Sequence, residues 1–161
     1  MANNKQNIRA IEIRNKKVSH DYFIGEKFEC GIVLTGAEVK SIRLGHCQIN
    51  DAFIRPDKHH NLFLLNAHIS EYKFTDISEQ NATRQRRILL HKQEIRKILN
   101  AIERDKMSVL PIRLYLKHRW IKLEIAICKG KKLFDKRESL KKQEALRDAQ
   151  RAIASAMRHS R

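Results

Sequence analysis

The hydrophobic and polar positions between residues 22 and 128 follow the pattern of short β-strands. In the stretch "WIKLEIAI", the apolar residues at 121, 123, 125 and 127 point one way, while Lys122 and Glu124 point the other. Five segments share a richness in β-branched and aromatic residues: 28–35, 49–55, 61–69, 108–117 and 119–128. The sequence therefore predicts a mainly β domain.

Turn signals separate several of these strands. The segments "RPDKHHN" and "KHRW" are typical of hairpin turns. Pro111 lacks a backbone N–H, so we expect its strand to lie at an edge or to carry a bulge. Near the amino terminus, "IRAIEI" is a candidate for an additional edge strand.

Two helices are predicted among the strands. "GAEVKSIRLGH" has Val39 and Ile42 at helical spacing and Gly45 as its C-terminal cap. "HKQEIRKILNAIERDK" places an apolar stripe (95, 98, 99 and 102) on one side, and this side is expected to cover an open end or face of the sheet. Between them, "SEYKFTDISEQNATRQRR" is polar and is expected to be a loop that orders on binding. Five or six short strands with an inserted helix favour a small closed barrel of the oligonucleotide-binding (OB) kind.

The charge balance points to a polyanionic partner. The 161 residues include 34 Lys and Arg against 18 Asp and Glu, a formal charge of +16. Nucleic acid and an anionic membrane surface both fit this field. No apolar run is long enough to span a membrane, and the amino terminus lacks the apolar stretch of a signal peptide. The three cysteines are odd in number and widely spaced, which argues against a disulfide framework. We expect a cytoplasmic, reduced protein.

The strand pattern stops after Cys128, and a basic tail follows. Residues 129–161 hold eleven Lys and Arg against four acids, and a narrow apolar stripe recurs at 146, 149, 153 and 157. One weak stripe is marginal as an isolated helix in water. Two interpretations stay open: a solvated helix on the barrel, or a tail that folds when it binds. Phe134 lies in this basic stretch, outside any predicted strand or stripe.

The residue patterns do not suggest catalysis. "KGKK" lacks the first glycine of a phosphate-binding loop. The pairs His46-Cys47 and His59-His60 have no second pair at metal-ligand spacing, so they favour surface positions over a metal site. No serine, histidine and acid form a recognisable triad. We therefore expect neither an enzyme nor a bound cofactor or metal.

Five sequence blocks occur in order along the chain: "NKKVSHDYFI", "FECGIVLTGAEVKSIRLG", "FLLNAHIS", "RRILLHKQEI" and "KGKKLFDKRE". Together they resemble the family of bacterial SsrA-binding proteins (small protein B, SmpB). The resemblance implies an OB-fold barrel with peripheral helices that binds the transfer-RNA-like domain of transfer-messenger RNA, also called SsrA RNA. Such proteins are not catalysts. With elongation factor Tu, which acts through the RNA, they carry this RNA to stalled ribosomes for trans-translation, in which the unfinished peptide is tagged for degradation.

The resemblance also implies a domain plan and a set of site residues. We expect a flexible basic amino terminus (1–14), a barrel (15–129) and a tail (130–161) that is disordered when free and helical in the message channel of the small ribosomal subunit. The implied RNA-binding residues are Asn15, Lys16, Lys17, His20, Glu29, Lys40, Arg43, Leu89 and Lys122. The implied ribosome-binding residues, at the decoding site, are Gly130, Lys131, Lys132, Phe134, Asp135, Lys136 and Arg137.

Several residues allow two interpretations. Glu29 either orients Lys122 or Arg43 through an ion pair, or accepts a proton from a base or ribose. Leu89 belongs either to the core or to the RNA surface. Seven aromatic residues are either core residues or base-stacking platforms: Tyr22, Phe23, Phe28, Phe53, Phe63, Tyr115 and Trp120. The alternative function is a general single-strand RNA binder or RNA chaperone. A membrane-surface role is disfavoured because residues 138–161 contain no Trp or Phe.

Overall fold

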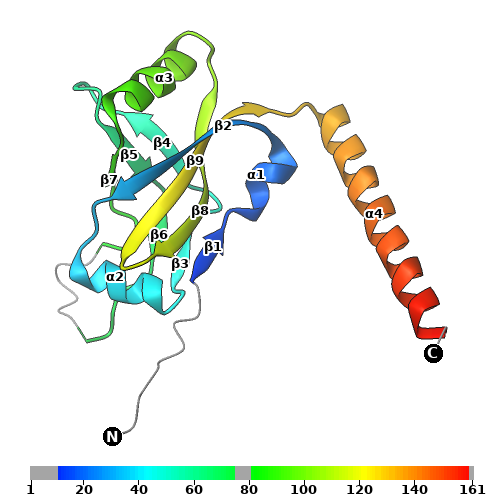
Figure 1. The fold of residues 1–161 in the computed structure, drawn as a ribbon. Helices are drawn as coiled ribbons and strands as arrows, with labels where there is room; N and C mark the ends of the chain where they lie inside the picture. Colours follow the sequence, from blue (N-terminus) through cyan, green and yellow to red (C-terminus); the bar gives the residue numbers. More distant parts are fainter. Residues whose placement is uncertain (1–10, 75–80, 160–161) are drawn as a thin grey trace, which may run out of the picture.

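A computed structural model describes residues 11–74 and 81–159 (Figure 1). Its main layer is an antiparallel seven-stranded sheet in the order β1-β8-β9-β2-β7-β5-β4, beside a two-stranded sheet of β3 and β6. The strands are β1 (Glu12–Arg14), β2 (Tyr22–Ile32), β3 (Cys47–Gln48), β4 (Phe53–Pro56), β5 (Leu62–Leu65), β6 (His68–Ile69), β7 (Arg86–Leu89), β8 (Ser108–Lys117) and β9 (Trp120–Gly130). The helices are α1 (Lys16–Asp21), α2 (Gly36–Arg43), α3 (Lys92–Glu103) and α4 (Leu133–His159).

The seven-stranded sheet curls so that its last strand, β4, packs beside β8. No β4–β8 ladder joins them within the described ranges, so the expected closed barrel is open at this seam. Part of the second edge of β8 is already used: residues 113–115 pair with β1, and the Ile112 carbonyl accepts the Asn15 N–H at 2.8 Å. Residues 108–110 of β8 face β4 across a cavity. β4 ends at Pro56, which has no N–H to offer. The OB-like curvature is present without complete hydrogen-bonded closure.

Several local predictions are confirmed. β4 pairs with β5 and β8 with β9 as hairpins, and β8 has a register shift between Pro111 and Arg113, the bulge expected near this proline. The edge-strand candidate at the amino terminus forms β1 in its described part. In α2, Thr35 and Glu38 form a capping box, and Gly45 follows the helix with φ +80°, a value that favours glycine.

Other local predictions need correction. The segments 49–55 and 61–69 are not single strands: the first contains only the start of β4, and the second divides into β5 and β6. Residues 16–21 form α1, which the sequence pattern did not predict. The polar segment 70–87 is not loop throughout, because β7 begins at Arg86; its residues 75–80 lie outside the described part of the chain.

The hydrophobic core lies between the curled sheet and α3. Ile98 and Ala101 of α3 are buried, and Ile95, Leu99 and Ile102 pack partly buried against the core. The predicted apolar stripe of this helix therefore covers the sheet as expected. Sheet residues from both halves, including Ile54, Leu64, Leu114 and Leu123, belong to the same cluster.

A buried charged cluster ties α2 to the start of β7. The Arg86 guanidinium is fully buried, and its Nε donates to Glu38 Oε1 at 2.8 Å. Arg84 binds the same carboxylate. Arg86 also donates to the carbonyls of Ala67 and Ala82 at 2.9 and 3.0 Å. Its buried positive charge is thus compensated and its donors are used, as an interior charge requires.

Glu38→Gln is expected to destabilise the fold by about 3 kcal/mol, because it leaves the buried Arg86 charge without a counter-ion. Glu26→Gln, which breaks an exposed pair with Lys97, is the matched control and is expected to cost less than about 1 kcal/mol. Urea unfolding of both variants measures the difference. Equal losses would show that the buried pair has no special role.

The same carboxylate contributes to acid sensitivity. Burial raises the pKa of Glu38, but hydrogen bonds from Arg84, Thr35 and Arg86 outweigh it and leave the pKa below its usual 4.5. A depressed folded-state pKa gives stability that is present above the unfolded value and lost as pH falls through the folded value. The stability gap between the wild type and Glu38→Gln should therefore narrow below about pH 4.5.

Candidate nucleic-acid interface

The outer face of the sheet brings together three of the predicted RNA-binding residues. Lys122 on β9 is paired with Gly31 on β2, and Gly31 is paired in turn with Leu89 on β7. Glu29 lies two residues before Gly31, on the same face of β2. Residues that are far apart in sequence thus form one continuous surface across β9, β2 and β7.

Glu29 is held by β8. Its carboxylate accepts hydrogen bonds from the Tyr115 hydroxyl and from Lys117 Nζ, the latter at 2.9 and 3.0 Å. These two hydrogen bonds lower the pKa of Glu29 below its usual value. Burial, assisted by Glu29, raises the pKa of Tyr115 to about 12. Of the two interpretations of Glu29, an ion pair is present, but its partner is Lys117; among the described residues Glu29 forms no ion pair with the predicted partners Lys122 and Arg43.

Two apolar residues on this sheet lie at the surface. Leu89 is 51% exposed, so it belongs to the surface and not to the core. Trp120, next to Lys122 along the same face of β9, is 74% exposed. The other aromatic candidates differ: Phe28 is buried and Phe23 is exposed, while Tyr22, Phe53, Phe63 and Tyr115 are partly buried. Tyr115 lies directly opposite Lys122 but is partly buried, so Trp120 is the exposed ring beside the predicted RNA contacts.

Asn15 has a structural position that sequence reasoning missed. Its side chain is buried, and the amide donates to the carbonyls of Ile49 and Pro111 at 2.9 and 3.0 Å. Its oxygen caps α1 by accepting from the Lys17 N–H at 3.1 Å. Every polar atom of this side chain is therefore used inside the protein, and it fixes α1 against β8.

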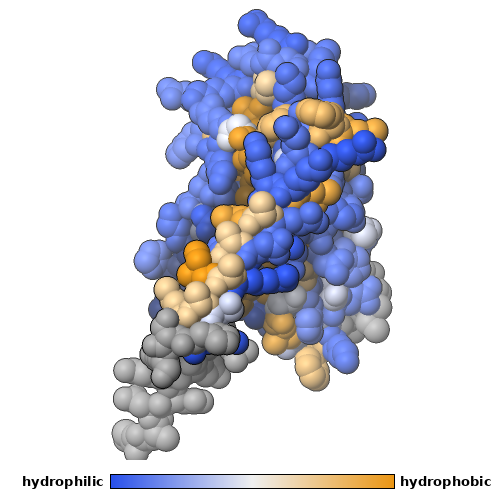
Figure 2. All heavy atoms as spheres, turned by 90° about the vertical axis from the view of Figure 1, so that its right-hand side faces the viewer, coloured by the Kyte–Doolittle hydropathy of each residue, from blue (hydrophilic) through white to orange (hydrophobic). Residues whose placement is uncertain are grey.

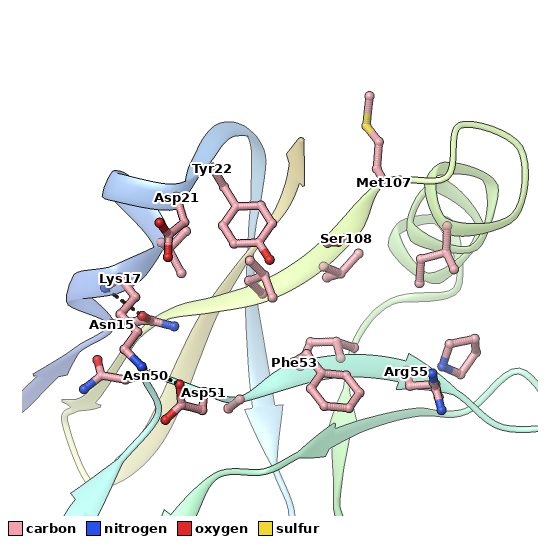
Figure 3. Close-up of a pocket in the computed structure, with 17 residues that line it drawn as sticks. Asn15, Lys17, Asp21, Tyr22, Asn50, Asp51, Phe53, Arg55, Met107 and Ser108 are labelled. Carbon is pink, nitrogen blue, oxygen red and sulfur yellow. Dashed lines mark hydrogen bonds and ion pairs between the residues drawn. The ribbon is translucent and has the colours of Figure 1, made fainter. Parts of the chain in front are cut away.

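The residues that Asn15 positions are more accessible. Lys16 and Lys17 are exposed on α1, and His20 Nδ1 lies 2.8 Å from Asp21 Oδ1. Lys17 Nζ donates to Asp51 Oδ1 at 2.6 Å at one side of the cavity in the open seam (Figure 3). On its other side α1 borders a groove that also includes Lys27, Arg113 and Glu124 from the sheet and Gln143 and Arg147 from α4.

Lys40 and Arg43 lie on α2, outside the Glu29–Lys122 face. Both side chains are exposed, and Lys40 Nζ stands 5.1 Å above the centre of the Tyr72 ring. α2 follows the far end of β2, below the sheet in Figure 1. The structure therefore divides the predicted RNA-binding residues among the sheet face, α1 and α2.

The start of the tail is fastened to α1. The Lys131 N–H donates to the Asp21 carbonyl at 2.9 Å, and Lys131 Nζ reaches the Ser19 carbonyl at 3.1 Å. Lys136 Nζ forms an ion pair with Asp21 Oδ1 at 3.1 Å. Asp135 accepts from the Lys132 N–H at 3.2 Å and so caps the start of α4. Lys131, Asp135 and Lys136, predicted as ribosome contacts, thus also build this joint.

Beyond the joint, α4 is exposed along its length and projects from the sheet (Figure 1). Phe134 is 72% exposed, as its sequence context predicted, while Lys132 and Arg137 are also at the surface. The apolar residues Leu146, Ile153 and Met157 are exposed as well. Viewed from the side of α4, Figure 2 shows a narrow apolar stripe between hydrophilic side chains. The expected disorder of the free tail stays a prediction.

Comparison with known proteins identifies the family. The family model described as "SmpB protein" matches residues 12–155. The chain belongs to the SmpB family. It is 46% identical to the SsrA-binding protein of Shouchella clausii over 92% of this chain and 94% of that protein. It is 48% identical to the SsrA-binding protein of Geotalea uraniireducens over 86% of this chain and 91% of that protein.

The likeness extends to a solved structure of an SmpB-family chain. That structure is described as "tmRNA-SmpB: a journey to the center of the bacterial ribosome", and it matches with a TM-score of 0.64 and 34% identity. The match covers 77% of this chain and 87% of the other. It supports the OB-like fold of this SmpB-family chain, whose sheet stays open at the β4–β8 seam.

None of the described helices is both long and apolar enough to cross a membrane. Across residues 11–74 and 81–159, no group of three or more His, Cys, Asp or Glu is arranged to hold a metal ion.

Asn15→Ala is expected to destabilise this SmpB-family chain by about 2–3 kcal/mol, because two buried carbonyls lose their donor and α1 loses its cap. Asn15→Asp keeps the capping oxygen but loses both donors, so it should also destabilise. Thermal unfolding checks both variants. An Asn15→Ala variant with unchanged stability and weakened RNA binding would instead show a direct contact with RNA.

Proposed function

We propose that the chain binds the transfer-RNA-like domain of transfer-messenger RNA and delivers it to stalled ribosomes for trans-translation. The observation that carries the proposal is the surface formed by Lys122, Glu29 and Leu89 in a chain of the SmpB family. Relatives are named SsrA-binding proteins, and a similar solved chain is described with transfer-messenger RNA and the ribosome. The protein acts as a binding factor in the cytoplasm and not as a catalyst. Elongation factor Tu joins it through the RNA.

The proposed surface suits a folded RNA. Lys122 supplies charge for phosphates, and Lys16 and Lys17 extend that field along α1. Leu89 and Trp120 offer apolar and aromatic area for unstacked bases, which protrude from the loops of folded RNA. Glu29 keeps Lys117 and the Tyr115 hydroxyl in place on the same face. Fixed donors and a fixed surface shape favour one RNA fold over arbitrary single strands.

Competition binding tests this function against the RNA-chaperone alternative. The transfer-RNA-like domain should bind more tightly than ordinary transfer RNA or unstructured RNA of equal length, and all affinities should fall with salt through counterion release. Lys122→Ala should weaken binding and reduce the salt slope by about 0.7–0.9, while leaving thermal stability nearly unchanged. Lys97→Ala on α3 is the matched control and should bind normally. Equal affinity for all three RNAs would favour the chaperone.

We further propose that the tail acts on the ribosome and not on the transfer-RNA-like domain. Lys131 and Lys136 fix the direction of α4 through Ser19 and Asp21. The exposed Lys132, Phe134 and Arg137 are then free to meet the decoding site, with the ring stacking on ribosomal bases and the cations on phosphates. The remaining basic helix is proposed to occupy the message channel and to be ordered there.

Removal of residues 131–161 is expected to preserve the folded domain and most of the RNA affinity, because the core clusters lie within residues 13–128. Peptide tagging on stalled ribosomes should be lost. Phe134→Ala should reduce tagging without altering charge, and Leu133→Ala, at an equally exposed neighbour, is the control.

Two assays on each tail variant, RNA affinity and tag addition, separate the outcomes. Loss of RNA binding on truncation would place the tail in the RNA clamp. Full tagging by the truncated protein, or equal losses in Phe134→Ala and Leu133→Ala, would contradict the proposed role of the ring.

A further inference from the structure

An exposed aromatic pair lies outside the sheet face, beside α2. The rings of Tyr72 and Phe74 meet edge to face, with centroids 5.4 Å apart and planes inclined at 61°. Phe74 is 85% exposed, more than Trp120 or Phe134. A large ring so exposed contributes little to the stability of the fold, because most of its apolar surface stays in water.

One cation lies against this pair and two more are close along the chain. Lys40 Nζ stands 5.1 Å above the centre of the Tyr72 ring. Lys73 separates the two aromatic residues in the sequence, and Arg43 lies one turn after Lys40 on α2; both side chains are exposed. Glu71 is the acidic neighbour in this short segment. Aromatic rings beside lysine and arginine form the combination that accepts a stacked base together with its phosphates.

The backbone that leads into the pair is anchored by two hydrogen bonds. The Ser70 N–H donates to the His46 carbonyl and the Ile69 N–H to the Ala82 carbonyl, both at 3.0 Å. Arg86 binds the carbonyls of Ala67 and Ala82 while it holds Glu38, which lies on the same helix as Lys40. The buried cluster thus holds the backbone just before the aromatic pair, at residues 67–70, beside α2, which limits the ordering cost of binding a ligand there.

We propose that the Tyr72–Phe74 pair is a stacking platform for an unpaired base of the bound RNA, with Lys40, Arg43 and Lys73 on the flanking phosphates. This inference rests on the proposed function and adds a second contact region to the sheet face. The cation above Tyr72 and the exposed Lys73 and Arg43 favour a polynucleotide over an apolar protein surface. It also gives the α2 residues Lys40 and Arg43 an aromatic partner in RNA binding.

Phe74→Ala should weaken binding of the isolated transfer-RNA-like domain about 5- to 100-fold, the range expected for the loss of one base–aromatic stack. The dependence of affinity on salt should not change, because no charge is removed. Phe74→Tyr retains a flat ring and should restore binding. Lys40→Ala should instead reduce the salt slope. Because Phe74 is exposed, thermal unfolding should be unaffected by its replacement.

A fluorescence titration reports stacking directly. Phe74→Trp in a Trp120→Phe background should be quenched when the RNA binds, whereas Ile153→Trp on α4 in the same background should not. Wild-type preference for the transfer-RNA-like domain together with unchanged affinity of Phe74→Ala would overturn the platform and leave the proposed function standing. A loss confined to ribosome binding would assign the pair to another partner. Absence of any RNA preference in the wild type would instead overturn the proposed function.

Discussion

The pairing of β2 with β9 is the constraint on which the remaining structure depends. The ladder runs from Tyr22 opposite Gly130 to Gly31 opposite Lys122, and it joins the β1-β8 half of the sheet to the β7-β5-β4 half. On its inner side, Phe28 and Leu123 belong to the core. On its outer side it presents Glu29 and Lys122. One pair of strands thus creates both the core and the proposed RNA surface.

The same ladder sets the position of the tail relative to that surface. Lys122 and Gly130 mark opposite ends of the β9 pairing, about 27 Å apart at ~3.4 Å per residue. At the Gly130 end, Asp21 fastens the tail through Lys131 and Lys136. The ladder therefore places the Glu29–Lys122 surface and the joint of the tail at opposite ends of β9, with α1 beside the joint.

The sequence predicted the elements whose formation depends on residues close together in the chain. The alternation in β9, the helical spacing and terminal Gly45 of α2 and the apolar stripe of α3 depend on neighbours a few residues away, and each was found from the sequence. The resemblance supplied Glu29 and Asn15 as site residues. Their actual partners could not be predicted, because Asn15 reaches Pro111, 96 residues away, and Glu29 is held by Lys117, 88 residues away.

Helix α1 was missed because only one of its six side chains, Val18, is apolar and buried, so the sequence shows no apolar stripe there. Its N-terminal cap, Asn15, is held in place by the distant contact with Pro111. Arg86 was assigned to a loop because it lies in a run of polar residues. Its burial could not be predicted, since its counter-ion, Glu38, is 48 residues away in the sequence.

The central claim is that the folded sheet face, and not the basic tail, holds the RNA. Amide hydrogen exchange of the full chain, with and without the transfer-RNA-like domain, tests it most directly, since exchange reports protection segment by segment. The account predicts added protection in β2, β7, β9 and α1, with little change along residues 140–159 of α4. Protection confined to α4, with the sheet strands unchanged, would contradict it.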